Sequence, residues 1–249
     1  MKKKRGLGLF ELTDCGGCAL NVIFLYERLL ELLKFYEIRE FKMASSKGVE
    51  GAIDVALVSG TVSCERDLRV LNEARRRSKY LVALGTCAVH GCVQGSVEGD
   101  LQENLREVYG RDMKEMKPLK SKPIDEYVRV DFSVPGCPYD KDEVFQLLLC
   151  LAMGVEPERK SYPVCIECKL NEYECVLIKR RVPCLGPITA GGCDAICLKS
   201  GLGCIGCRGP LPEGGHPSLE LTLLRELGYD EDYLRRKFRT FSRLEVGRP

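Results

Sequence analysis

The sequence predicts an α/β protein, in which a doubly wound parallel sheet of the flavodoxin-like kind is followed by a largely irregular, cysteine-rich segment with terminal helices. Two observations predict the sheet. Short apolar runs of strand length alternate with segments whose apolar residues recur at helical spacing, and the runs end at glycine or polar residues. A third observation predicts the irregular segment, because hydrophobic periodicity is lost between Tyr162 and Pro212.

The individual elements follow from the same patterns. Strands are expected at residues 6–12, 38–43, 53–58, 80–84 and 127–132, and helices at 19–36, 65–78 and 141–153. The run at 53–58 (IDVALV) is almost continuously apolar, which is typical of a strand covered on both faces. The helical pattern returns from Ser218 to Arg248. We therefore expect two domains, residues 1–156 and 157–249.

Composition excludes several classes of protein. The chain is 45% hydrophobic and 30% charged, as in a soluble globular protein, and its formal net charge of +2 gives no general attraction to nucleic acid. The basic run Arg75 to Arg77 is interpreted as a solvated helix face, with docking to an acidic partner as the alternative. No apolar run reaches the roughly 18 residues of a spanning helix, and no signal-peptide core follows Met1. We expect a cytoplasmic protein without a membrane span.

Cysteine is the most informative residue type, with 15 in the chain. Between Cys165 and Cys207 the spacing is C-x2-C-x6-C-x8-C and then C-x3-C-x6-C-x2-C, which makes two sets of four. Four thiolates form a complete cage for a cubane iron–sulfur cluster or for a tetrahedral zinc ion. Disulfides are disfavoured, because they are rare in the cytoplasm and because the first 155 residues can build a core without them.

A third set of four is predicted from the topology. Cys15 and Cys18 follow the first strand, Cys87 follows the strand at 80–84, and Cys137 follows the strand at 127–132. Ligands of doubly wound sheets bind at the carboxyl ends of the strands, so we expect all four on loops at that edge. Thiolates suit iron and zinc alike. Two structural zinc sites in the tail remain an alternative, although they would leave this third set unexplained.

Five motifs together resemble the small, electron-transferring subunit of [NiFe] hydrogenases. They are DCGGC at 14–18, GTCAVHG at 85–91, PGCP at 135–138, CLGPITAGGC at 184–193 and GCIGC at 203–207. The resemblance covers nearly the whole chain. It is closest to the cytoplasmic group that contains sulfhydrogenase delta subunits and the small subunits of F420-non-reducing hydrogenases.

The resemblance implies three [4Fe–4S] clusters and their ligands. The proximal cluster would be held by Cys15, Cys18, Cys87 and Cys137, the distal cluster by Cys165, Cys168, Cys175 and Cys184, and the medial cluster by Cys193, Cys197, Cys204 and Cys207. Many members carry a histidine where this chain has Cys165. Many also carry proline where this chain has Cys197, together with a three-iron medial cluster. Cys197 therefore implies a fourth iron in the medial cluster.

The same resemblance implies a function without catalytic residues in this chain. Hydrogen would be cleaved at a nickel–iron site in a separate large subunit, and the clusters would carry electrons to a downstream redox partner. That partner would be a flavin or NAD(P) diaphorase subunit, a heterodisulfide reductase or a ferredoxin. Two alternatives stay open: a cluster-bearing subunit of a quinone-type respiratory complex, and a zinc-stabilised adaptor.

Three cysteines and one histidine are left outside these sets. Cys150 lies in the apolar run FQLLLCLAM and is interpreted as packing. Cys92 stands five residues after Cys87, where some oxygen-tolerant members of the family have an extra cysteine. Cys64 ends the strand at 53–58 and is a second candidate neighbour of the proximal cluster. His90 is a candidate hydrogen-bond donor to a cluster sulfur, with a plain loop histidine as the alternative.

Overall fold

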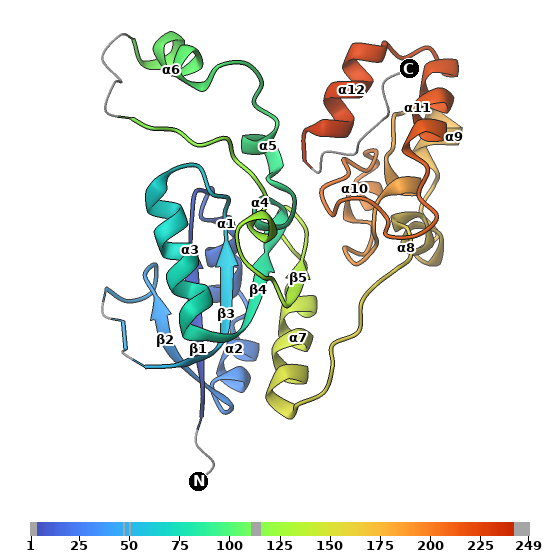
Figure 1. Cartoon of the computed structure of the whole chain (residues 1–249). Helices are drawn as coiled ribbons and strands as arrows, with labels where there is room; N and C mark the ends of the chain where they lie inside the picture. The colour runs from blue at the N-terminus through green and yellow to red at the C-terminus, as the bar shows by residue number, and fades with distance from the viewer. Residues whose placement is uncertain (1–3, 47, 50, 111–115, 242–249) are drawn as a thin grey trace.

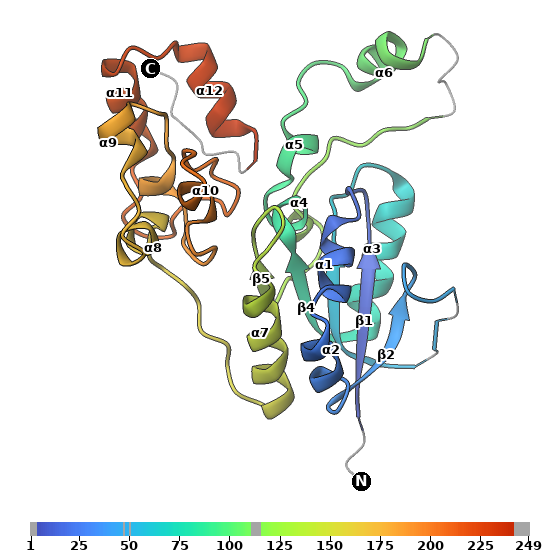
Figure 2. The same cartoon turned by 180° about the vertical axis from the view of Figure 1, so that it is seen from behind.

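The computed structural model describes residues 4–46, 48–49, 51–110 and 116–241 (Figures 1 and 2). Within these residues, five parallel strands form one sheet in the order β2-β1-β3-β4-β5. The strands are β1 Arg5–Glu11, β2 Tyr36–Phe41, β3 Ile53–Ser59, β4 Ser78–Leu84 and β5 Phe132–Val134. From β1 the chain first adds β2 on one side and then β3, β4 and β5 on the other, so the winding direction changes between β1 and β3. The sheet is therefore doubly wound, which confirms the expected fold class.

Helices cover both faces of the sheet (Figures 1 and 2). On one face lie α1 Gly17–Ile23, α2 Glu27–Leu32 and α7 Lys141–Met153, and on the other lies α3 Glu65–Arg77. Successive residues of β3 serve opposite faces: Val55 and Leu57 pack under α2 and α7, whereas Ala56 and Val58 pack under α3. This is why the run at 53–58 is almost uniformly apolar.

Two elements differ from the sequence prediction. The single helix expected at 19–36 is two short helices, because the chain breaks at Tyr26, which has a positive φ of 51°. The end of that range, at Tyr36, is already the start of β2.

The strand expected at 127–132 begins only at Phe132, and it is preceded by the short 3-10 helix η1 Ile124–Glu126. Val128 and Val130 do pack against the core, which accounts for the alternating pattern. Asp131 interrupts the ladder, since its carboxylate accepts a hydrogen bond from Leu81 N at 2.9 Å and pairs with Arg75 at 2.6 Å.

Between β4 and β5 the chain leaves the sheet at its carboxyl edge. It forms α4 Gly85–His90 and α5 Cys92–Gly95 at that edge, and α6 Leu101–Tyr109 at the far end of an arm (Figure 1). No residue of α6 is buried.

The second part of the chain lies beside the carboxyl edge of the sheet and is joined to α7 by an extended segment (Figure 2). Its elements are α8 Val164–Leu170, α9 Val176–Arg180, η2 Gly186–Ile188, α10 Ile196–Lys199, α11 Pro217–Glu226 and α12 Glu231–Arg239. Leu224, Leu234 and Phe238 of the two terminal helices complete a hydrophobic cluster with cysteines of this part. The helical pattern expected at 242–248 lies outside the described residues.

A bilayer-crossing helix would need about 20 apolar residues. The described part of the chain contains no helix of that length and apolarity.

Candidate metal centres

The first quartet, Cys15, Cys18, Cys87 and Cys137, gathers at the carboxyl edge of the sheet. Burial raises the pKa of the Cys18 thiol, and the nearby charges of Asp14 and the three other cysteines raise it further. Cys15 and Cys137 are exposed on loops, as expected. The other two differ from the expectation, because α1 and α4 begin at the glycines before them and place Cys18 and Cys87 in first helical turns.

Close backbone packing holds this quartet together. Gly85 has a φ of +81°, and a Cβ there would overlap Cys18 Sγ, so only glycine fits. Thr86 N donates to Gly136 O at 3.0 Å, and Gly136 N donates to Thr86 Oγ1 at 3.1 Å. The start of α4, which carries Cys87, is thereby fixed to the PGCP loop, which carries Cys137.

Cys92 lies among the first quartet. Its side chain is buried, and its thiol lies within hydrogen-bonding reach of both Cys87 and Cys137; donation from Cys92 lowers the pKa of Cys87 and lowers that of Cys137 to about 7. Cys64 instead precedes α3 at the N-cap position, where its carbonyl accepts from Leu68 N at 3.3 Å. Of the two candidate neighbours, Cys92 is therefore the one that contacts the quartet. Cys150 lies in α7 and is partly buried.

The second quartet is built from a contiguous stretch. Cys165 and Cys168 lie on α8, Cys175 is the N-cap residue of α9, and Cys184 precedes η2. Burial raises the pKa of Cys165 to about 12, with further contributions from the other three thiols. A Cβ at Gly186 would lie 3.3 Å from Cys165 Sγ and 3.4 Å from Cys184 Sγ, so the backbone closes one side of the group.

The third quartet lines a cavity. Cys193, Cys197, Cys204 and Cys207 all face a space of about 260 Å³, whose wall also contains Cys137 of the first quartet. Burial raises the pKa of Cys207 to about 11, and a hydrogen bond from the backbone N–H of Cys137 opposes this rise. Four cysteines that line one cavity provide the ligand set of an iron–sulfur cluster.

Two observations join the three quartets in a row. Cys137, in the first quartet, lines the same cavity as Cys207 and the other cysteines of the third. Cys204 N, in the third quartet, donates to Cys184 Sγ, in the second, at 3.3 Å. The third quartet therefore lies between the first and the second.

None of the quartets presents the geometry of a single-ion site. Within the ranges that the structure describes, no three His, Cys, Asp or Glu side chains lie close enough together to bind one metal ion. A tetrahedral zinc ion takes four ligands, and a thiolate ligand lies about 2.3 Å from the metal.

A buried arginine ties the two parts of the chain together. Arg208 is 3% exposed and forms a bidentate pair with Glu143 of α7 at 2.8 and 3.0 Å. It also donates to Pro135 O and to Gly191 O, at 2.7 Å each. Thr86 Oγ1 adds a further link by donating to Cys207 O. The PGCP loop and the third quartet are thus held against each other.

His90 takes part in the same junction. Its Nε2 lies 3.2 Å from Arg208 O, and a Cβ at Gly209, which has a φ of +84°, would overlap the ring. Burial lowers the pKa of His90, so the ring is neutral and donates to the carbonyl. This bond occupies Nε2, and a bond from His90 to a cluster sulfur stays a prediction.

Sequence reasoning missed two buried carboxyl groups. Glu167 is 8% exposed and is bonded to the loop that carries Cys193. Glu220 of α11 is 5% exposed, its Oε1 makes no hydrogen bond within the described residues, and burial raises its pKa to about 7. The sequence did carry a signal for Glu167, which stands between the two cysteines of the CIEC motif. Glu220 lies in an ordinary helical pattern, and the sequence carried no signal that it would be buried.

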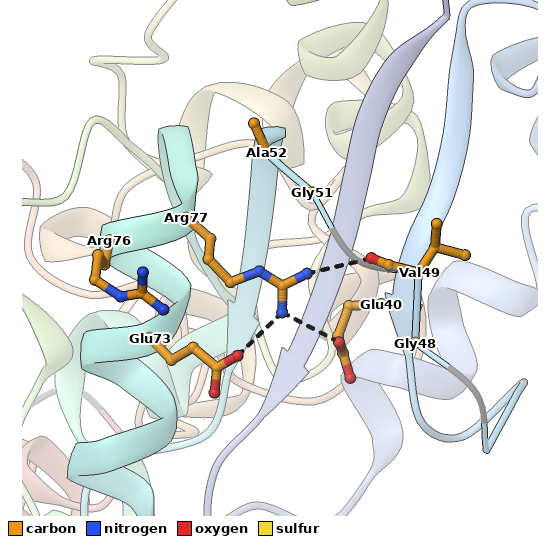
Figure 3. Close-up of a pocket in the computed structure, with 8 residues that line it drawn as sticks. All are labelled: Glu40, Gly48, Val49, Gly51, Ala52, Glu73, Arg76 and Arg77. Atoms are coloured by element: carbon orange, nitrogen blue, oxygen red, sulfur yellow. Dashed lines mark hydrogen bonds and ion pairs between the residues drawn. The ribbon is translucent and has the colours of Figure 1, made fainter.

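A larger hollow of about 600 Å³ lies at the opposite end of the sheet, between the end of α3 and the connection before β3 (Figure 3). Arg77 in its wall is already bonded to Glu73 at 3.0 Å and to Glu40 at 3.5 Å (Figure 3). The hollow contains no cysteine among its lining residues, so it lies apart from the candidate metal centres.

Comparisons with known proteins agree over most of the chain. The family model described as NADH ubiquinone oxidoreductase, 20 Kd subunit, matches residues 15–151, which include the whole first quartet. The chain is 61% identical over 237 residues to the Sulfhydrogenase 2 subunit delta of Pyrococcus furiosus, which covers 95% of this chain and 99% of that protein. It is 33% identical over 235 residues to a subunit of the vhu F420-non-reducing hydrogenase of Methanocaldococcus jannaschii, with 82% and 81% covered.

Solved structures show the same similarity. A chain of the NAD+-reducing [NiFe]-hydrogenase in the H2-reduced state matches with a TM-score of 0.57 and 27% identity, over 63% of this chain and 96% of that one. A chain of the reduced Ni-Fe-Se hydrogenase from Desulfomicrobium baculatum matches with a TM-score of 0.56 over 85% of this chain and 96% of that one. At 17% identity the second match shows the fold alone.

Proposed function

Because this chain belongs to the family of [NiFe] hydrogenase small subunits, we propose that it relays electrons from a nickel–iron site in a separate large subunit to a further redox partner through three [4Fe–4S] clusters. Membership makes it an iron–sulfur oxidoreductase subunit that acts on hydrogen. The observation that supports the relay is the row of quartets, in which the third quartet shares a cavity wall with the first and a hydrogen bond with the second.

In this proposal the first quartet binds the proximal cluster, the second quartet the distal cluster and the third quartet the medial cluster. Bound clusters supply one-electron carriers. The chain contributes thiolates and backbone donors, such as Gly206 N, which lies 3.4 Å from Cys204 Sγ. Donors to the sulfurs stabilise the more negative, reduced form of a cluster and so raise its potential.

Exposure supports the placement of the partners. Cys15 and Cys137 are exposed at the carboxyl edge of the sheet, which we assign to the large subunit. On the other side, Leu170 and Ile178 are 79% and 75% exposed on the helices that carry the distal ligands. We assign this side to the downstream partner, which is a diaphorase subunit, a heterodisulfide reductase or a ferredoxin. The proposal also includes two domains, residues 1–156 and 157–249, and a cytoplasmic location.

Metal analysis after anaerobic purification tests the proposal. Three cubane clusters require about twelve irons and equivalent acid-labile sulfide per chain. About eight irons would mean that one quartet is assigned wrongly. A colourless chain with about two zinc ions and no labile sulfide would refute the relay and favour the zinc-stabilised adaptor.

The respiratory-complex alternative is tested by the proteins that co-purify. The family model shared with that complex covers residues 15–151, whereas the hydrogenase relatives extend across the cysteine-rich part. We expect co-purification with a large hydrogenase subunit and hydrogen-dependent reduction of a viologen dye. Co-purification with quinone-complex subunits, without that activity, would favour the alternative.

A further inference from the structure

Glu167 connects the distal and medial quartets through its side chain. It lies on α8 between Cys165 and Cys168. Its carboxylate accepts hydrogen bonds from Gly192 N at 2.5 Å, Cys193 N at 3.3 Å and Ala195 N at 3.2 Å. One buried side chain of the distal motif therefore binds the loop that carries the first medial ligand.

The loop at residues 192–195 has a strained backbone conformation whose N–H groups need a hydrogen-bond acceptor such as the Glu167 carboxylate. Gly192, Asp194 and Ala195 have positive φ values of 116°, 54° and 47°. For a residue other than glycine this conformation costs about 1–3 kcal/mol, so surrounding contacts must maintain it. Its N–H groups converge on one point, as in backbone nests that bind anions.

The carboxylate is held mainly by neutral donors. Tyr162 Oη donates to Glu167 Oε1 at 3.2 Å, in addition to the three backbone groups. Hydrogen bonds to an ionised acceptor contribute about 1.5–3 kcal/mol each, roughly twice the value for neutral partners. The negative charge of Glu167 therefore contributes to holding the loop, in addition to the shape of its side chain. Cys193 Sγ lies 3.9 Å from Glu167 Oε2, so the same charge also acts on a medial ligand.

We propose that Glu167 is a positioning residue of the relay, which fixes the medial ligand loop to the distal helix and sets the electrostatic environment of the medial cluster. This inference rests on the proposed function. It differs from a general stabilising role because it assigns the effect to one cluster of three. Electron transfer becomes slower as the separation between carriers grows. A loop held at one position therefore also sets the distance, and so the rate of transfer, between the medial and distal clusters.

The test uses the hydrogenase complex purified anaerobically with four variants. Glu167→Ala removes the acceptor, Glu167→Gln keeps its shape without the charge, and Tyr162→Phe removes one donor. Glu174→Gln is the matched control, because Glu174 directly precedes a distal ligand but is 52% exposed and pairs only with Arg180 among the described residues. Iron content and potentiometric electron paramagnetic resonance of each cluster are measured.

We expect Glu167→Ala to lose the medial signal and about a third of the iron, with the proximal and distal signals kept. Glu167→Gln and Tyr162→Phe should keep the iron, and Glu167→Gln should shift the medial midpoint potential to a more positive value. The control should match the wild type.

Unchanged medial spectra and potentials in Glu167→Gln and Glu167→Ala would overturn the inference, as would an equal loss of all three signals. A wild-type complex with about twelve irons alongside these results would leave the proposed function standing. A wild-type complex without iron would overturn both.

Discussion

Replacement of Arg208 by methionine should destabilise the junction between the two parts of the chain. Arg208→Met keeps a side chain of similar length but removes the charge and every donor. Glu143 then loses its cation, while Pro135 O and Gly191 O lose their donors. Because Arg208 is 3% exposed, water does not replace these bonds without opening the junction.

The magnitude follows from burial. Removing one partner of a buried ion pair costs about 3–5 kcal/mol, and the 19% exposure of the Glu143 side chain places this pair at the lower end. A loss of about 3 kcal/mol corresponds to a factor of about 150 in rate, if the junction opens before the transition state of unfolding. The unfolding of such a chain is treated as a rate because cluster loss makes it irreversible.

The assay is the loss of helical circular dichroism with time at a fixed elevated temperature under anaerobic conditions. Arg28→Met is the matched control, because Arg28 pairs with Asp142 on the same α7 with side-chain exposures of 46% and 67%. An exposed pair contributes at most about 1 kcal/mol. If Arg208→Met unfolds no faster than Arg28→Met, or if its effect simply adds to that of Glu143→Gln, the reasoning is refuted.

Three other predictions concern Cys92, His90 and Glu220. Cys92→Gly should change the electron paramagnetic resonance of the reduced proximal cluster, whereas Cys64→Ser should not; identical spectra in both would remove Cys92 from the site. Burial lowers the pKa of His90, so below a pH of about 6.5 His90 is protonated in the unfolded state but not in the folded state. The thermal midpoint should therefore fall as pH is lowered through this range, and His90→Gln should reduce the slope. The raised pKa of Glu220, about 7, predicts the opposite sign: its protonation favours the folded state, and this contribution is lost as pH rises from about 4.5 to about 7. Glu220→Gln should therefore stabilise the chain most above neutral pH, and equal midpoint shifts at all pH values would contradict this.

The fold was largely predictable because most of its strands are covered on both faces. β3 and β4 are long apolar runs, and their length and composition leave little choice of structure. The prediction was wrong at two element boundaries, each of which is set by a single residue. Asp131 delays β5 through its bonds to Leu81 and Arg75, and Tyr26 divides a segment whose apolar spacing suits one helix.

The grouping of the cysteines had two sources. Spacing alone indicated two local sets, and the parallel topology indicated that Cys15 and Cys137 would meet although they are 122 positions apart in the numbering. The links between the sets were not predictable, because Arg208, Glu167 and His90 act through backbone groups of distant segments. Such bonds require no particular residue in the partner, and so they leave no pattern in a sequence.

The cavity of the medial quartet has walls from both parts of the chain, including Asn21 of α1 and Tyr139 of the loop after β5 from the first part, and Thr189 and Leu198 from the tail. This sharing has a consequence for maturation. The distal cage is complete within one continuous stretch and can be filled while the tail is still separate. The four medial thiols also come from one stretch, but the cavity that they line is closed only when the tail docks, and Arg208, directly after Cys207, binds Glu143 of the first part at that junction. In the proposed relay, we therefore expect the medial cofactor to be inserted before the tail docks or as it docks, while the cavity is still open.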